Sequence, residues 1–141
     1  MRSQATSEAI DLAGCSIESA MSSTGIALRE LAFVESLGDE LSMSLPTLGL
    51  EACASSDGRV VSVHMHREGH EGFCGFPLDF EGITFATAES EVCARLGPPA
   101  VRGEGKSGSW MRYVFADRYL HFMYSRDSGL LEMVTCGLQE V

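Results

Sequence analysis

Four side chains of metal-binding types lie within eleven positions of the sequence: His64, His66, His70 and Cys74. On a β-strand, residues two apart point to the same side, so His64 and His66 would project together. Imidazole and thiolate are zinc ligands, but a glycine-rich connector carries His70 and leaves its reach unfixed. Ligand type without fixed geometry is weak evidence, so we expect solvated histidines and no metal or other cofactor. A metal-dependent enzyme using His64 and His66 stays open as an alternative.

Two further patterns resemble catalytic motifs without completing them. Residues 100–107 end in Gly-Lys-Ser like a phosphate-binding loop, but Ala100 stands where the pattern requires glycine. A helix must also follow such a loop, and here a strand-like run follows. Cys74 could act as a nucleophile with His70 as its base, although a structural, inert cysteine is the commoner case. We therefore expect no catalytic residues and no enzyme activity.

Two aromatic runs, residues 110–116 and 119–125, carry the side chains best suited to binding a protein. If Asp117 and Arg118 form the tip of a hairpin, the period of two separates its faces. One face would enter the core: Met111, Tyr113, Phe115, Leu120, Phe122 and Tyr124. The other would carry Trp110, Arg112, Val114, Tyr119, His121 and Met123.

Tryptophan, tyrosine, arginine and methionine are enriched at binding interfaces, because they combine large area with a polar group. The second face of the hairpin is therefore either a second core under a helix or a surface for a partner. We take the partner interpretation, with the helices on the opposite face. The expected partner-binding residues are Trp110, Arg112, Tyr119, His121 and Met123.

The chain is strongly acidic, with 20 Asp and Glu against 10 Lys and Arg and a net charge of -10. Such a charge repels nucleic-acid phosphates and anionic membranes, so neither is an expected partner. Residues 1–58 hold nine of the acids against two arginines. Acidic side chains there would steer a basic protein partner: Glu30, Glu35, Asp39, Glu40 and Glu51.

Cysteine usage predicts a cytoplasmic protein. The five cysteines are an odd number without a C-x-x-C pair, and a chain of 141 residues can fold without disulfides. Residues 12–15, Leu-Ala-Gly-Cys, match a lipoprotein cleavage box, but the preceding stretch is polar instead of apolar. No segment approaches the ~20 apolar residues of a membrane helix.

Local signals predict a single α+β domain over residues 1–141, with residues 1–10 expected to be flexible. Residues 85–99 predict a short helix with Thr87 as cap, Arg95 in the last turn and a stop at Gly97. A polar loop over residues 102–109, the aromatic hairpin and a strand at residues 130–136 would follow.

Two segments of the first half match segments of the second half in the same order. Residues 16–21 match residues 87–92 at a shift of 71, and residues 50–57 match residues 120–127 at a shift of 70. Residues 26–35 and 40–45 would be further strands. We therefore predict two tandem helix-plus-antiparallel-meander repeats, residues 11–68 and 78–141, joined by a connector at residues 69–77. Together they would form one curved antiparallel sheet with helices on one face.

The predicted helix ending in Leu96-Gly97-Pro98-Pro99, followed by a meander and present twice, resembles the β-lactamase-inhibitor-protein-like superfamily that includes the SmpA/OmlA lipoproteins. Residues 76–85, with Trp110-Met111-Arg112-Tyr113 and Leu120-His121-Phe122, resemble small immunity proteins encoded beside bacterial polymorphic toxins. This resemblance is clearest over residues 76–136. It implies a concave sheet that binds a protein, without catalytic residues.

The expected function is that of an immunity protein that binds and neutralises a cognate basic toxin, most simply a nuclease, in bacterial competition. The alternative is a small non-catalytic adaptor or assembly factor that could form a homodimer through its aromatic face.

Overall fold

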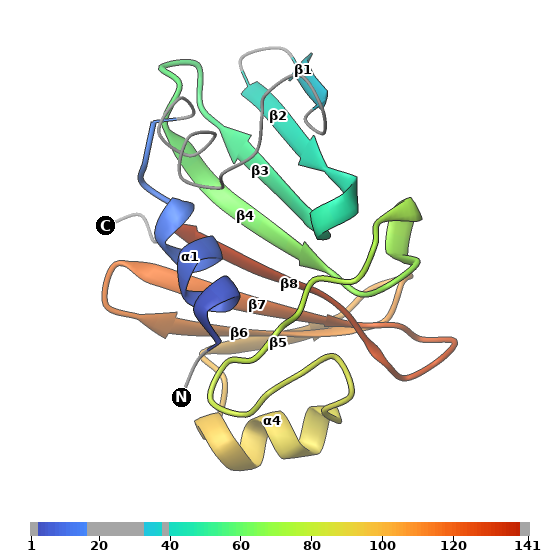
Figure 1. The fold of residues 1–141 in the computed structure, drawn as a ribbon. Helices are drawn as coiled ribbons and strands as arrows, with labels where there is room; N and C mark the ends of the chain where they lie inside the picture. The colour runs from blue at the N-terminus through green and yellow to red at the C-terminus, as the bar shows by residue number, and fades with distance from the viewer. Residues whose placement is uncertain (1–2, 17–32, 38–39, 139–141) are drawn as a thin grey trace.

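The computed structural model of the chain describes residues 3–16, 33–37 and 40–138. Eight strands and two α-helices make up the described chain, with two single turns of 3-10 helix between them (Figure 1). In order they are α1 (Gln4–Leu12), β1 (Phe33–Leu37), β2 (Glu40–Leu45), η1 (Pro46–Leu48), β3 (Leu50–Ala54), β4 (Val60–His66), η2 (His70–Gly72), α4 (Glu89–Leu96), β5 (Val101–Glu104), β6 (Ser109–Phe115), β7 (Arg118–Tyr124) and β8 (Leu131–Leu138).

The eight strands form one antiparallel sheet in the order β1-β2-β3-β4-β8-β7-β6-β5. The chain runs from β1 to the centre at β4, crosses to the far edge at β5 and returns to the centre at β8. The long-range pairing of β4 with β8, in which Val63 lies opposite Cys136, joins the two runs of strands. The sheet is therefore continuous from one edge to the other.

One face of this sheet forms the core. The residues of alternate strand positions are buried there: Met43, Leu45, Leu50, Ala52, Val63, Met65, Val134, Cys136, Leu120, Phe122, Met111 and Tyr113. α1 and the segment that leads to α4 cover them with their own buried side chains: Ala9, Ile10, Leu12, Phe76, Leu78, Phe80, Ile83 and Val92. We call this the core face and the opposite side the open face.

The predicted tandem-repeat fold is wrong. The described chain is a single continuous antiparallel sheet with two short helices, instead of two equivalent helix-plus-meander units. The predicted helix match at residues 16–21 does not hold at its start, because Ser16 forms a β-bridge with Arg59 and the first helix lies earlier, at Gln4–Leu12. Residues 17–21 lie outside the described residues. Short Ser- and Glu-rich segments match by chance, which explains the error.

The two helices also occupy different places. α1 lies across the middle of the sheet and contacts β4, whereas α4 lies at the end of the sheet that carries β5 and β6 (Figure 1). Residues 4–10, expected to be flexible because they lie near the end of the chain, form most of α1. Ser3 caps this helix by accepting a hydrogen bond from the Thr6 amide, and Thr6 is fully buried. The start of the described chain is therefore part of the core.

The second half of the chain follows the local predictions closely. The predicted helix is observed as α4, with Arg95 in its last turn and a positive φ at Gly97. Thr87, however, does not cap it: the cap position is Ala88, and the Thr87 hydroxyl accepts from the Thr84 amide. Tyr113 and Tyr124 fasten both ends of α4 to the sheet, donating to the Gly97 and Thr87 carbonyl oxygens at 2.9 and 3.2 Å.

The aromatic hairpin is observed as β6 and β7, with its tip one residue earlier than predicted. Phe115 pairs with Arg118, so Ala116 and Asp117 form the turn, and Ala116 has a positive φ of 52°. The strand register therefore differs by two residues from the predicted one. Each side chain still lies on the predicted face of the hairpin, because a shift of two keeps the alternation. Phe115, predicted to be buried, is 41% exposed because it lies at the hairpin end. The predicted polar loop over residues 102–109 contains strand β5 at Val101–Glu104.

No helix in the described segments is both long and apolar enough to cross a membrane.

Candidate functional site: the open face of the sheet

Strand pairing sets the side chains of the open face in rows that run across the sheet. The central row consists of Glu51, His64, Thr135, His121 and Arg112, each opposite the next on the neighbouring strand. A second row consists of Cys53, Ser62, Gly137, Tyr119 and Val114. A third consists of His66, Met133, Met123, Trp110 and Gly103. Residues from β3 to β5 thus share one surface, which neither described helix covers.

The five predicted partner-binding residues of the hairpin all lie on this open face and are half-buried: Trp110, Arg112, Tyr119, His121 and Met123. We call them the aromatic band. Trp110 stacks on His121 with ring centroids 5.1 Å apart, and the Arg112 guanidinium lies 4.2 Å from the centre of the Tyr119 ring. The band is therefore packed against itself while one side of each group stays accessible.

Two glycines form the floor of the aromatic band. A Cβ at Gly103 would lie 2.6 Å from Trp110 Cζ2, and a Cβ at Gly137 would overlap the Tyr119 ring. Both rings consequently lie close against the backbone of the neighbouring strands, β5 and β8. Glycine within a strand commonly marks such a close approach.

Two polar atoms of the aromatic band are buried without a hydrogen-bond partner among the described residues, Arg112 Nε and His121 Nδ1. Burial lowers the pKa of His121 below its ordinary value, and the nearby charge of Arg112 lowers it further. His121 is therefore neutral at pH 7. Arg112 supplies the positive charge of the band.

The four residues of metal-binding types, His64, His66, His70 and Cys74, do not form one cluster. His64 Nδ1 lies 2.7 Å from the Thr135 hydroxyl, and its Nε2 lies 3.7 Å from Cys53 Sγ. Burial is the main reason that the pKa of His64 is lowered, while Glu51 opposes the shift. Cys74 is exposed, and no hydrogen bond joins it to His70 in the part of the chain described. The contact between Cys53 and His64 has no signal in the sequence, because it follows only from the pairing of β3 with β4.

His66 and His70 meet on the same face, at the turn around η2. Their Nδ1 atoms are 2.9 Å apart, so one of the two must carry the hydrogen between them. Each Nε2 faces a carboxylate, Glu51 at 3.5 Å and Glu132 at 3.4 Å. His66 is only 1% exposed and stacks on Phe73. The expectation of solvated histidines is therefore wrong for His66.

The described residues contain no group of three or more histidine, cysteine, aspartate or glutamate side chains arranged to hold a metal ion. The Gly105-Lys106-Ser107 sequence forms the connection between β5 and β6, and a strand follows it instead of a helix. This geometry does not provide the helix N-terminus of a phosphate loop.

Of the predicted acidic steering residues, only Glu51 has a described side chain. Glu51 lies on the open face, and its pKa is lowered from the ordinary value. The contact with His66 is the main cause of this lowering. The charge of His64 lowers the pKa further, whereas burial raises it. Glu35 and Glu40 belong to β1 and β2, and Glu30 and Asp39 lie outside the described residues. Glu51 is thus part of the polar row instead of a free surface charge.

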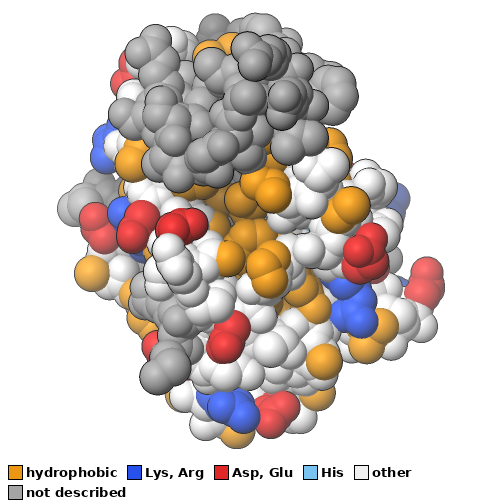
Figure 2. All heavy atoms as spheres, viewed as in Figure 1, with side chains coloured by type: hydrophobic (Ala, Val, Ile, Leu, Met, Phe, Trp, Pro, Cys, Tyr) orange, Lys and Arg blue, Asp and Glu red, His pale blue; other side chains and the backbone are white. Residues whose placement is uncertain are grey.

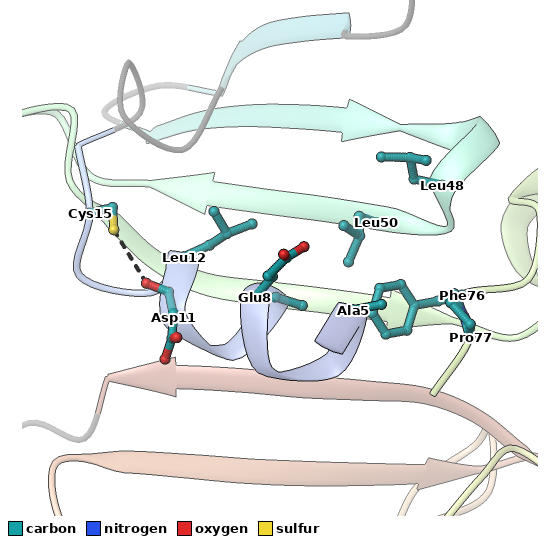
Figure 3. Close-up of a pocket in the computed structure, with 10 residues that line it drawn as sticks. Ala5, Glu8, Asp11, Leu12, Cys15, Leu48, Leu50, Phe76 and Pro77 are labelled. Carbon is teal, nitrogen blue, oxygen red and sulfur yellow. Dashed lines mark hydrogen bonds between the residues drawn. The ribbon is translucent and has the colours of Figure 1, made fainter. Parts of the chain in front are cut away.

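An apolar pocket of about 510 Å³ lies on the other side of the sheet, between α1, the start of β3 and Phe76–Pro77 (Figure 3). Its described walls are mostly aliphatic, and Glu8 and Asp11 stand at its rim on exposed positions of α1. Figure 2, viewed from this side, shows apolar side chains gathered in the middle of the molecule. The pocket lies on the face opposite the aromatic band.

No protein-family model and no curated protein matches the chain. Among solved structures, the chain is similar to a cysteine-rich secretory protein from Staphylococcus aureus subsp. aureus Mu50, with a TM-score of 0.61 and 12% sequence identity. The similarity covers 92% of this chain and 44% of that protein, so this chain corresponds to less than half of its neighbour's length. At this identity the similarity concerns the fold alone.

Proposed function

We propose that this protein binds a protein partner through the open face of its sheet and, in the form that its sequence favours, neutralises a cognate bacterial toxin. One observation carries the proposal. The described helices contribute their buried side chains to the core, while the open face presents the half-buried aromatic band formed by β6 and β7.

The packing of the aromatic band supports binding instead of a purely structural role. Trp110 rests on His121, and Arg112 rests on Tyr119, so these side chains already have limited freedom in the free protein. Side chains that are ordered before binding lose less conformational entropy in the complex. Aromatic and arginine side chains of this kind commonly contribute most of the affinity of an interface.

The charge of the chain supports a basic partner, such as a nuclease. A net charge of -10 attracts positively charged proteins and speeds their encounter by up to about 10–10³-fold at low salt. No disulfide joins any of the five cysteines, all of which lie in the described part of the chain, and this supports the proposal of a reducing, cytoplasmic site of action.

The proposal is tested by expressing the protein together with the toxin encoded next to its gene. Growth should be rescued, and the two purified proteins should form a complex. Arg112→Ala and Tyr119→Ala should each weaken that complex by about 1–3 kcal/mol, measured by calorimetry. Glu91→Ala, on the exposed side of α4, is the matched control and should leave affinity unchanged.

Absence of rescue and of a complex would refute the toxin proposal. Loss of thermal stability equal to the loss of binding in both variants would show that Arg112 and Tyr119 serve the fold. The alternative function, an adaptor that pairs with a second copy of itself, predicts a dimer on size exclusion and its loss in Trp110→Ala.

A further inference from the structure

We propose that the aromatic band is a carboxylate-binding surface, in which the Arg112 guanidinium pairs with an acidic side chain of the partner and the rings of Trp110 and Tyr119 hold the apolar atoms next to it. The existence of a protein partner rests on the proposed function; the chemistry of the surface rests on the contacts below.

Arg112 is a cation without an anion in the described part of the chain. No described carboxylate lies within ion-pair distance of it, and its Nε is buried without an acceptor. Its guanidinium lies over the Tyr119 ring with Nε buried, so the edge formed by Nη1 and Nη2 is the one that can reach a ligand. A guanidinium edge matches a carboxylate in a bidentate pair.

His121, the neighbour of Arg112 across the strand pair, brings no negative charge that would compete with an anion. It lies opposite Arg112 on β7 and leaves Nδ1 buried without a partner. Neutral imidazole can donate a hydrogen bond from Nδ1 in one of its tautomers. With Nδ1 buried, His121 packs against Trp110 beside Arg112, and the donors to a ligand on this surface come from the guanidinium.

The side chains around Arg112 indicate which kind of group would carry the carboxylate. Trp110 and Tyr119 lie against Gly103 and Gly137, so both rings rest close to the backbone of the sheet. Val101 and Val114 flank it and are 51% and 45% exposed. An aspartate or glutamate next to aromatic or aliphatic residues fits this combination of charge and apolar area.

The contact with the partner would then have two parts of opposite charge. The acidic residues of the first half of the chain would still attract a basic protein, but the aromatic band itself would take an acidic residue. The partner expected from both features is a basic protein with a carboxylate near the centre of its contact surface.

Trp110 is the single tryptophan of the chain, so its fluorescence reports directly on this surface. We would titrate the full chain at constant ionic strength with benzoate, benzamide and benzamidine, which share one ring and carry negative, zero and positive charge. Benzoate should change the fluorescence saturably and bind at least about threefold more tightly than benzamidine, the difference expected for a half-exposed ion pair.

Arg112→Gln should abolish the preference for benzoate. Arg95→Gln on α4, where the arginine is 45% exposed, is the matched control and should retain the preference. Equal binding of the three compounds to the unmodified protein, or a benzoate preference that survives in Arg112→Gln, would overturn the inference. The comparison of the three compounds needs no variant and no toxin, so its outcome is independent of the growth rescue.

Discussion

At the scale of single residues, the open face holds several titratable groups in positions where protonation is disfavoured. His64 is buried between Thr135 and Cys53, and His121 lies beside the Arg112 charge; both have a lowered pKa in the folded protein. In the unfolded chain the same histidines titrate near 6.5. The folded protein therefore binds fewer protons than the unfolded chain as the pH falls past this value.

This difference predicts that acidification destabilises the protein while its carboxylates are still ionised. The unfolded state binds more protons, so the free energy of unfolding should fall as the pH drops from about 8 to about 5.5, at a rate of up to ~1.4 kcal/mol per pH unit for each histidine. Denaturant unfolding at several pH values measures it. A further loss should follow below pH 4.5, the ordinary pKa of a glutamate, because the pKa of Glu51 is lowered in the fold.

The double variant His64→Gln, His121→Gln should show a smaller fall between these pH values. A fall of equal size in the variant would contradict the assignment of the effect to these two histidines. His66 and His70 keep their contacts in this variant. The variant therefore distinguishes the contribution of His64 and His121 from that of His66 and His70.

At the scale of elements, the turn between β2 and β3 depends on one glycine. Gly49 ends η1 with a φ of 71°, in the left-handed region that favours glycine. A Cβ there would overlap the Cys74 carbonyl oxygen and lie 2.5 Å from the Phe76 amide nitrogen. The turn is therefore pressed against the backbone of residues 74–76, which leads back to the core face.

Gly49→Ala should therefore destabilise the protein by about 2 kcal/mol or more, because it adds a clash with backbone to the cost of a positive φ. Gly58→Ala is the matched control: Gly58 has a φ of 82°, and a Cβ there would meet nothing within 4 Å. It should cost only about 1 kcal/mol. Equal losses in thermal unfolding would show that the close approach of residues 74–76 contributes nothing.

The elements differ in how far the sequence could predict them. α4 was predictable because Glu89, Arg95 and Gly97 are local signals for the start and end of a helix. β5 was not, since Gly103 and the polar residues around it are typical of a loop. α1 was also missed: its buried Thr6 and alanines give a weak apolar pattern, and its stability comes from packing against β4.

At the scale of the whole molecule, the pairing of β4 with β8 makes one sheet from two runs of strands. These central strands have neighbours on both sides, while β5 has a paired strand on one side among the described residues. The amides of β4 and β8 can exchange with solvent only when the sheet opens, whereas an edge strand can detach by itself.

Hydrogen exchange should therefore be slowest in β4, β7 and β8 and fastest, among the strands compared, in β5. Mass spectrometry of deuterium uptake over minutes to hours measures this order. Separate exchange of the segments 40–66 and 101–138, as two independent units, would instead support a division of the molecule into two halves.

The candidate site was partly predictable for a definite reason. The period of two placed Trp110, Arg112, Tyr119, His121 and Met123 on one face from the sequence alone, and an error of two residues in the hairpin register left that assignment unchanged. The partners of His64 and His66 could not be predicted, because Thr135, Glu51 and Glu132 reach them through the pairing of β4 with its neighbours and through the turn at η2.

The sequence by itself determined the acidic charge, the helix at residues 89–96 and the division of the aromatic hairpin into an apolar and a mixed face, because each depends on composition or on neighbours a few positions away. Only the tertiary structure decided that α1 and Val92 of α4 join the core on the apolar side and that the mixed face continues across β8, β4 and β3. Those arrangements depend on contacts between residues far apart in the chain, for which local patterns carry no signal.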